Sequence, residues 1–192
     1  MKGVYLVLAL ALVLASMPTL AATYEVKREQ EGPFSFKIMG IEFNKGSSLR
    51  RESVLFNDPS CPVQLVKNAM AFNYADRRFT IGSTTNLTFG QPVMALEVRH
   101  ILFDVLGRHM RNLANLEARD FAAEPASLSG TWNVFNDNDI SELLTTVTYV
   151  SRARLADGTQ WVFNSDNLTL ALGTLHLEKK IDDDKPPTSG PK

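Results

Sequence analysis

The sequence predicts an all-β sandwich. Its dominant periodicity is two, which is typical of strands that bury one face. Residues 92–103 and 144–155 are the two long stretches that alternate in this way. The second stretch runs into Asp157-Gly158, and an Asp-Gly pair between two alternating segments is a strong hairpin signal. Many short strands with turn residues between them, and almost no helical period, favour two packed sheets.

The N-terminus predicts export. Lys2 precedes an apolar run from Val4 to Ala15, and Pro18 and small residues ending at Ala22 follow it. This run is too short to cross a bilayer as a helix, but it matches the apolar region of a signal peptide. We therefore expect residues 1–22 to be a cleaved signal peptide and the mature protein to be periplasmic or extracellular. No second long apolar segment follows, so no transmembrane span is expected.

The remaining strands are shorter. Within 92–103, one face carries the apolar side chains and His100, and the other face carries Glu97 and Arg99. The expected buried face consists of Met94, Leu96, Val98, His100 and Leu102. We expect the large aromatic residues Trp132, Tyr149, Trp161 and Phe163 to fill the core. Further strands are expected at residues 34–43, 53–56, 63–74, 79–87, 127–135, 160–163 and 168–177.

Two segments fit more than one structure. The segment from His109 to Phe121 fits a helical spacing about as well as it fits a bulged strand, and periodicity does not choose between them. Asp139 resembles a helix N-cap with Glu142 three residues on, so residues 139–144 are expected to begin with one helical turn.

Residues 23–177 are expected to form a single sandwich domain. The last segment, residues 178–192, is charged and contains prolines, with Ile181 as its one other apolar side chain. It buries too little apolar surface to offset its ordering entropy, so we expect a disordered charged tail.

Composition excludes several classes of protein. The chain has 192 residues, with 20 Lys and Arg against 21 Asp and Glu, for a net charge of -1. This balance excludes a strongly basic nucleic-acid binder. Cys61 is the single cysteine, which excludes an intramolecular disulfide and a Cys-rich zinc module.

One segment resembles a known family. Asn86-Leu87-Thr88 precedes an alternating strand that ends in Ile101-Leu102-Phe103-Asp104, with Gly107 completing the turn. Over about residues 71–162 this pattern resembles the FxLYD-type extracellular immunoglobulin-like domains. The resemblance implies an immunoglobulin-like antiparallel β-sandwich in an exported protein, and it implies no catalytic residues.

Two turns are expected to depend on an Asp and a Gly. Asp104 is suited to cap turn amides and Gly107 to adopt a positive φ. Asp157 and Gly158 predict a primed hairpin turn in the same way. An ion pair between Asp104 and His109 across the first hairpin is a further hypothesis.

The sequence contains no metal or cofactor motif. The three histidines are His100, His109 and His176, and they show no HxH or HxxxH spacing. The acidic run at 136–139 lacks the central Gly and distal Glu of an EF-hand loop. We therefore expect no bound metal and no cofactor.

Cys61 lies between Pro59 and Pro62 with no histidine near it in sequence. Three interpretations remain open: a buried apolar side chain, an intermolecular disulfide, or the nucleophile of a Cys–His enzyme.

The function that the sequence favours is that of an exported, non-catalytic binding or protein-interaction module. It would act on an unidentified protein partner or form a homo-oligomer. The alternatives are a structural subunit of a surface assembly and a Cys-dependent hydrolase or redox enzyme. Asn86 and Asn167 begin Asn-x-Thr sites, which are glycan acceptors in hosts that glycosylate exported proteins.

Overall fold

The computed structural model describes residues 24–33, 35–38, 41–44, 49–75, 78–133 and 142–179. The expected signal peptide, the acidic run and nearly all of the expected tail lie outside the described residues, as do residues 139–141 of the expected helical turn at 139–144.

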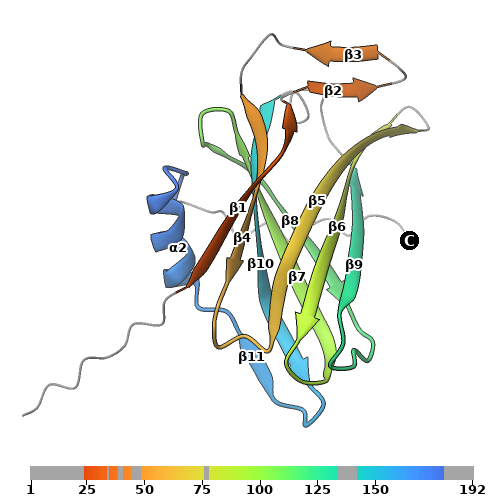
Figure 1. Ribbon diagram of the computed structural model, residues 1–192, viewed down its shortest axis with the longest axis vertical. Coiled ribbons are helices and arrows are strands. Elements are labelled where there is room, and N and C mark those ends of the chain that lie inside the picture. Colours follow the sequence, from red (N-terminus) through yellow and green to blue (C-terminus); the bar gives the residue numbers. More distant parts are fainter. Residues whose placement is uncertain are drawn as a thin grey trace, which may run out of the picture.

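The large sheet has six strands (Figure 1). Its main path runs β1-β4-β10-β7-β8, and β11 also pairs with β10. Neighbouring strands are antiparallel, except that β4 and β10 are parallel. The bounds are Glu25–Pro33 for β1, Arg50–Asn57 for β4, Val93–Asp104 for β7, His109–Glu117 for β8, Leu143–Leu155 for β10 and Gln160–Val162 for β11.

The small sheet has three antiparallel strands in the order β5-β6-β9. They span Val63–Ala75, Arg78–Phe89 and Ala126–Asn133. A separate hairpin joins β2, Ser35–Ile38, to β3, Ile41–Asn44. The large and small sheets pack face to face, so the predicted all-β sandwich is confirmed.

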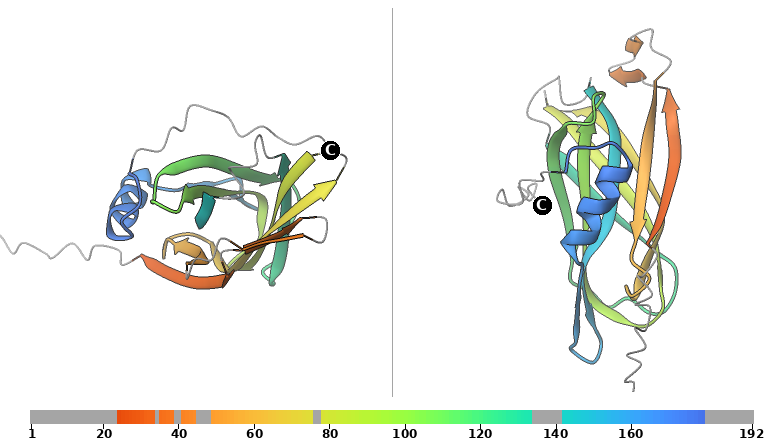
Figure 2. Two further views of the ribbon diagram at one scale, coloured as in Figure 1. Left: turned by 90° about the horizontal axis from the view of Figure 1, so that it is seen from above. Right: turned by 90° about the vertical axis from the view of Figure 1, so that its left-hand side faces the viewer.

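Helix α2, Ser165–Thr174, packs on the other face of the large sheet and forms a third layer (Figure 2). The buried residues of this contact are Val54 and Phe56 of β4, Ile101 and Phe103 of β7, Val147 and Tyr149 of β10, and Leu168, Ala171 and Leu172 of α2. The predicted strand at 168–177 is therefore wrong. Leu168, Leu170 and Leu172 fit a period of two, but Leu168, Leu172 and Leu175 also fit a helical face. Asn164 caps the helix by accepting a hydrogen bond from the Asp166 amide.

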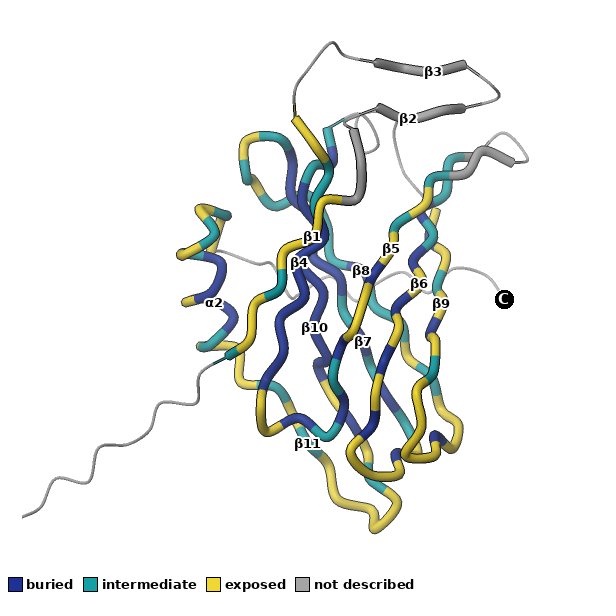
Figure 3. Tube along the Cα trace, viewed as in Figure 1, coloured by how far each residue is buried: buried dark blue, intermediate teal, exposed yellow. Residues whose placement is uncertain are grey.

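This third layer changes the expected burial of β10. Residues 145–151 are all buried, because the small sheet covers one face of the strand and α2 the other (Figure 3). The expectation of a half-buried strand is wrong there. In β7, by contrast, Leu96, Val98, His100 and Leu102 are buried as expected, whereas Met94 is 44% exposed.

The ambiguous segment forms a strand. β8 covers His109–Glu117, with a register shift where it meets Leu102 and Phe103, so the bulged strand is correct over this range. Phe121 then forms an isolated bridge with Val93. The sequence did not predict β1, because its charged residues obscure any alternation. Trp132 and Tyr149 are buried, and Trp161 and Phe163 are partly buried. No described helix is both long enough and apolar enough to cross a bilayer.

Candidate interaction surface

The described strands leave four long sheet edges, and three of them are protected. Edge strands expose unpaired backbone groups, so charges, bulges or a covering side chain usually block them. On β1, Lys27, Arg28 and Glu29 are charged, and Arg28 forms a two-pronged ion pair with Glu52 at 2.7–2.8 Å. The outer edge of the large sheet at β1 is therefore unsuited to pairing with another strand.

The edge of β5 is closed by a side chain that imitates a strand. The Asn57 amide nitrogen donates to the Leu65 carbonyl at 3.0 Å, and its Oδ1 accepts from the Leu65 amide at 2.8 Å. A register shift between Leu65 and Lys67 interrupts the ladder next to this contact. Asn57 therefore occupies both backbone groups of Leu65 and also ties β5 to the end of β4.

The edge of β8 is covered from the small sheet. The Trp132 indole nitrogen donates to the Ala114 carbonyl at 3.2 Å. Its ring lies across Gly130, where an added Cβ would be 2.5 Å from the ring. Glycine at 130 therefore leaves room for Trp132 to close the sandwich at this edge.

The edge of β9 lacks the charges, bulge and strand-like capping seen at the β1 and β5 edges, although Trp132 of this strand reaches across to the Ala114 carbonyl of β8. Its eight residues, Ala-Ser-Leu-Ser-Gly-Thr-Trp-Asn, contain no charge and no proline. Its pairing with β6 continues over eight residues without a register shift. No backbone hydrogen bond from another described element reaches its outer side. We call this strand the β9 edge.

The face next to the β9 edge is also almost uncharged. Lys67 is the one charged residue among the exposed residues of the small sheet within 64–72, 79–89 and 126–133. Polar side chains on this face bond to one another across the strands, as where Ser127 Oγ donates to Asn86 Oδ1 at 2.8 Å. We call this surface the open face; it consists of Val66, Lys67, Ala69, Ala71, Thr84, Asn86, Thr88, Ser127, Ser129, Thr131 and Asn133.

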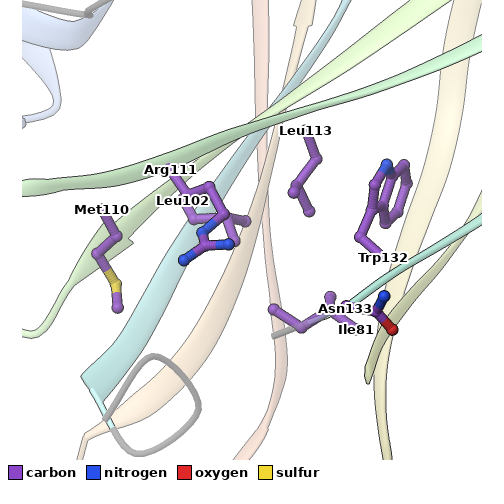
Figure 4. Close-up of a pocket in the computed structure, with 7 residues that line it drawn as sticks. All are labelled: Ile81, Leu102, Met110, Arg111, Leu113, Trp132 and Asn133. Carbon is purple, nitrogen blue, oxygen red and sulfur yellow. The ribbon is translucent and has the colours of Figure 1, made fainter. Parts of the chain in front are cut away.

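A small pocket lies between β8 and β9. Its lining residues are Ile81, Leu102, Met110, Arg111, Leu113, Trp132 and Asn133 (Figure 4). The space inside it accommodates about one water molecule. It is far smaller than the sites that hold cofactors or drug-sized ligands. The β9 edge and the open face are therefore better candidates for binding than this pocket.

A layer of buried polar side chains crosses the core between the sheets. Every member is at most 3% exposed, and apolar clusters pack on both sides of the layer. We call it the polar layer; it consists of Ser53, Asn68, Ser83, Thr85, His100, Thr146 and Thr148. His100 Nε2 lies 3.3 Å from Ser83 Oγ, and its Nδ1 lies 3.0 Å from Thr148 Oγ1.

The Ser83–His100 contact resembles part of a catalytic triad, but its surroundings do not suit catalysis. Burial lowers the pKa of His100 to about 3, so the ring is neutral. The ring of Trp132 packs edge-to-face against it at 5.5 Å. A substrate cannot reach Ser83 Oγ without separating the sheets.

Cys61 is buried in the turn between β4 and β5. The Val63 amide donates to its Sγ at 3.4 Å. Burial raises the pKa of the Cys61 thiol to about 12, which is opposite to the shift that activates a nucleophile. The intermolecular disulfide stays a prediction, and it would require this turn to open.

The Asp104 turn connects β7 to β8. Asp104 Oδ1 accepts hydrogen bonds from the amides of Leu106 and Arg108, and Gly107 has a φ of 76°. Burial alone would raise the pKa of Asp104, but the hydrogen bonds from Arg108 and Leu106 outweigh it and hold this pKa below its usual value.

The partner of Asp104 differs from the one hypothesised. Arg108 Nε donates to Asp104 Oδ2 at 2.7 Å, while His109 Nε2 contacts Asn112 Oδ1 at 2.9 Å. The hypothesised Asp104–His109 ion pair is therefore wrong. The register shift where His109 meets Phe103 accompanies this change of partner.

The Asp157 turn connects β10 to β11. Asp157 Oδ1 accepts from the Thr159 amide at 2.9 Å, and Gly158 has a φ of 89°. Among the described residues, His176 is the one non-glycine residue with a positive φ, so Asp157 is not left-handed. The turn is thus not the primed type that was expected, which needs a positive φ at both positions.

No group of three metal-ligating side chains occurs in the described part of the chain. The Asp157 turn lies near Cys61, because the Trp161 indole nitrogen donates to Ser60 Oγ at 3.1 Å. No contact among the described residues joins either of them to the Asp104 turn, so the sequence-predicted residues do not form one site. Sequence reasoning missed the β9 edge, although the alternation of Ser127, Ser129 and Thr131 was visible. It also missed the polar layer, whose signal was His100 on an otherwise apolar face.

Comparisons with protein-family models, with curated proteins and with solved structures find no match to this chain. The resemblance to FxLYD-type domains accordingly stays a prediction.

Proposed function

We propose that this protein is an exported, non-catalytic interaction module with an immunoglobulin-like sandwich, and that its protein partner binds at the β9 edge. The β9 edge is the observation that carries the proposal, because an uncharged, regular edge is suited to pair with an extended segment of another chain. The weakly charged open face beside it would widen the contact. Export rests on the signal-peptide pattern at residues 1–22.

The strand order supports the immunoglobulin-like part of the proposal. In immunoglobulin variable domains, strands A, B, E and D lie in one sheet and strands G, F, C, C′ and C″ in the other. No described strand takes the place of D or C″. Here β5-β6-β9 correspond to A-B-E, and β10-β7-β8 correspond to F-C-C′. β4 occupies the place of strand G, but it comes from the N-terminal side and runs parallel to β10.

The enzyme alternative has less support. A Cys-dependent enzyme needs a thiolate beside a base, whereas Cys61 is buried with a raised pKa. The alternative of a structural subunit in a surface assembly also uses an edge strand, and it differs in the partner rather than in the binding surface.

A site-specific photo-cross-linker tests the proposal. We would place it at Ser129 on β9 and, as a matched control, at exposed Gln30 on the charged β1 edge. The proposal expects a discrete adduct with an envelope or extracellular protein from position 129 and none from position 30. Equal adducts at both positions, or none at 129, would contradict it.

Two charge substitutions test whether the partner binds at the β9 edge or on the open face. Thr131→Lys places a charge on β9, and Thr88→Lys places the same charge near the end of β6, the central strand of the small sheet. We expect Thr131→Lys to abolish the adduct at 129 and Thr88→Lys to weaken it less. The reverse order would move the binding surface to the open face.

A further inference from the structure

The polar layer contains two side-chain groups without a protein partner. Asn68 Oδ1 accepts from Ser83 Oγ at 2.8 Å and from Thr85 Oγ1 at 2.9 Å, but its Nδ2 has no hydrogen-bond partner among the described residues. Ser53 Oγ likewise has no hydrogen-bond partner among the described residues. Both residues are 1% exposed, so bulk water does not reach them.

Turning the Asn68 side-chain amide over would not give all of its polar atoms a hydrogen-bond partner. If the amide were turned over, Nδ2 would donate to the two hydroxyl groups and Oδ1 would be left instead. Either way one end of a buried amide lacks a partner inside the layer. Buried polar groups in folded proteins are nearly always paired with protein or with ordered water.

The two orphan groups belong to strands of opposite sheets and lie on the same side of a contact that ties those strands together. Asn57 of β4 is tied to Leu65 of β5 by two hydrogen bonds. Ser53 lies four residues from Asn57 along β4, and Asn68 lies three residues from Leu65 along β5. At about 3.3 Å per residue, Ser53 stands roughly 13 Å from this shared tie. Asn68 stands roughly 7–10 Å from it on the same side, because the register shift between Leu65 and Lys67 shortens this part of β5.

Both side chains also point into the same space. Ser53 pairs in register with Thr146, and Thr146 pairs with Leu102, which belongs to the inter-sheet core. Val54 faces α2 instead, so Ser53 faces the small sheet. Asn68 contacts Ser83, and Ser83 Oγ lies 3.3 Å from His100 Nε2 of the large sheet, so Asn68 faces the large sheet from the other side.

We propose that the polar layer binds a long-lived internal water molecule between Asn68 and Ser53. The water accepts a hydrogen bond from Asn68 Nδ2 and exchanges another with Ser53 Oγ, which gives it the two to four polar partners that buried waters have. It thereby joins β5 of the small sheet to β4 of the large sheet. This inference is independent of the partner at the β9 edge.

Nuclear magnetic resonance on the mature chain in water tests the site. Relaxation dispersion of ¹⁷O water counts long-lived waters, and nuclear Overhauser effects from water to the Asn68 side-chain amide locate one. We expect a water contact at Asn68 with a residence time longer than that of surface hydration. The absence of such a contact in the folded wild-type protein would overturn the proposal.

Substitutions assign the water to its two partners. Asn68→Leu and Ser53→Ala each remove one partner, and each should lose the dispersion contribution of one water. Ser151→Ala is the matched control, because it removes a buried hydroxyl that already donates to Glu97 at 2.7 Å. Ser53→Ala removes a single hydroxyl group and should still fold, so it provides the test if Asn68→Leu does not fold. An unchanged water count in folded Ser53→Ala or Asn68→Leu would overturn the assignment.

Discussion

Histidine 100 is the residue whose chemistry depends most on its position in the fold. The elements packed around it present Ser83, Thr148 and Trp132, which are uncharged. An imidazolium here would have neither solvent nor a counter-charge. The neutral ring is consequently part of the folded state, and its protonation opposes folding.

The first prediction concerns acid. The pKa of His100 is about 3 when folded, against an ordinary value of 6.5. Below pH 6.5 the unfolded chain binds a proton that the folded chain does not, so stability falls as pH falls towards 3. The slope reaches about 1.4 kcal/mol per pH unit. Urea unfolding at pH 7, 6 and 5 measures it, and the window above pH 5 avoids titration of the carboxylates.

His100→Gln is the control for this pH dependence. It keeps a polar side chain in the layer but removes the titrating group, so its stability should change little between pH 7 and 5. A His100→Gln protein with the wild-type slope would contradict the assignment of the pH dependence to His100.

The second prediction concerns the thiol. Since burial raises the pKa of Cys61 to about 12, iodoacetamide at pH 8 should label the folded protein far more slowly than free cysteine. In guanidinium chloride, labelling should rise to the rate of an ordinary thiol. Mass spectrometry of the alkylated chain follows both rates. Fast labelling of folded protein would show that the turn at 58–62 opens readily.

At the scale of single elements, the hairpin turns at 104–107 and 157–158 can be compared, because each contains an Asp and a Gly. Each turn has a Gly with a positive φ, but their surroundings differ. A Cβ on Gly158 would meet nothing within 4 Å, whereas a Cβ on Gly107 would lie 2.9 Å from the His176 carbonyl oxygen. The Glu178 amide also donates to the Gly107 carbonyl at 2.8 Å, so the β7–β8 turn holds the end of the α2 segment.

The third prediction follows from this difference. Gly158→Ala should cost about 1–2 kcal/mol, the cost of a left-handed backbone alone. Gly107→Ala should cost more, because the segment after α2 must also move. Urea unfolding of both variants measures the difference, and equal losses would show that this segment yields without cost. Gly158→Val should destabilise further than Gly158→Ala, because its side chain is β-branched.

The fourth prediction concerns helix α2. Leu172 is fully buried against the large sheet, and Leu170 is 70% exposed on the same helix. Leu172→Ala should cost about 2–5 kcal/mol. Leu170→Ala should change stability by less than about 0.5 kcal/mol. Thermal unfolding of the pair tests whether α2 is an integral layer, and similar effects would show that it is not.

The elements differ in how far their sequences determine them. Residues 93–104 were predictable as a strand, because apolar and charged side chains alternate over many positions. Residues 168–177 were not, because their leucines fit both periods and the choice depends on the apolar face of the large sheet that they cover. The same cover explains why β10 is buried on both sides, which no pattern within 144–155 could indicate.

At the scale of the whole molecule, the candidate surface depends on topology. The alternation at 127–133 predicts a strand, but whether that strand lies at an edge depends on which strands pair with it. The polar layer likewise needs both sheets, since it brings Ser53, Asn68 and His100 together from three strands. Sequence therefore indicated the class of fold, whereas the binding edge required the strand order.

The fifth prediction concerns processing of the whole chain. If the N-terminus is a signal peptide that is cleaved after Ala21 or Ala22, the mature protein should begin at Ala22 or Thr23. Tyr24 is then retained, and it stacks on Phe56 with ring centroids 5.2 Å apart. N-terminal sequencing of the exported protein measures the start. A chain that keeps Met1 in a membrane fraction would contradict both the cleavage and the proposed export.

The position of β10 has a consequence for the order of folding. Its neighbours in the large sheet are β4 and β7, and Glu52 of β4 pairs with Thr145 of β10 from far away in the sequence. The hairpins β5–β6 and β7–β8 close short loops, so we expect them to form early. The parallel pairing of β4 with β10 closes a much longer loop, so we expect it to form late. Until residues 143–155 have been synthesised, β4 and β7 each have one edge whose backbone groups are unpaired. We therefore expect the chain to be most prone to aggregation before residues 143–155 pair with β4 and β7.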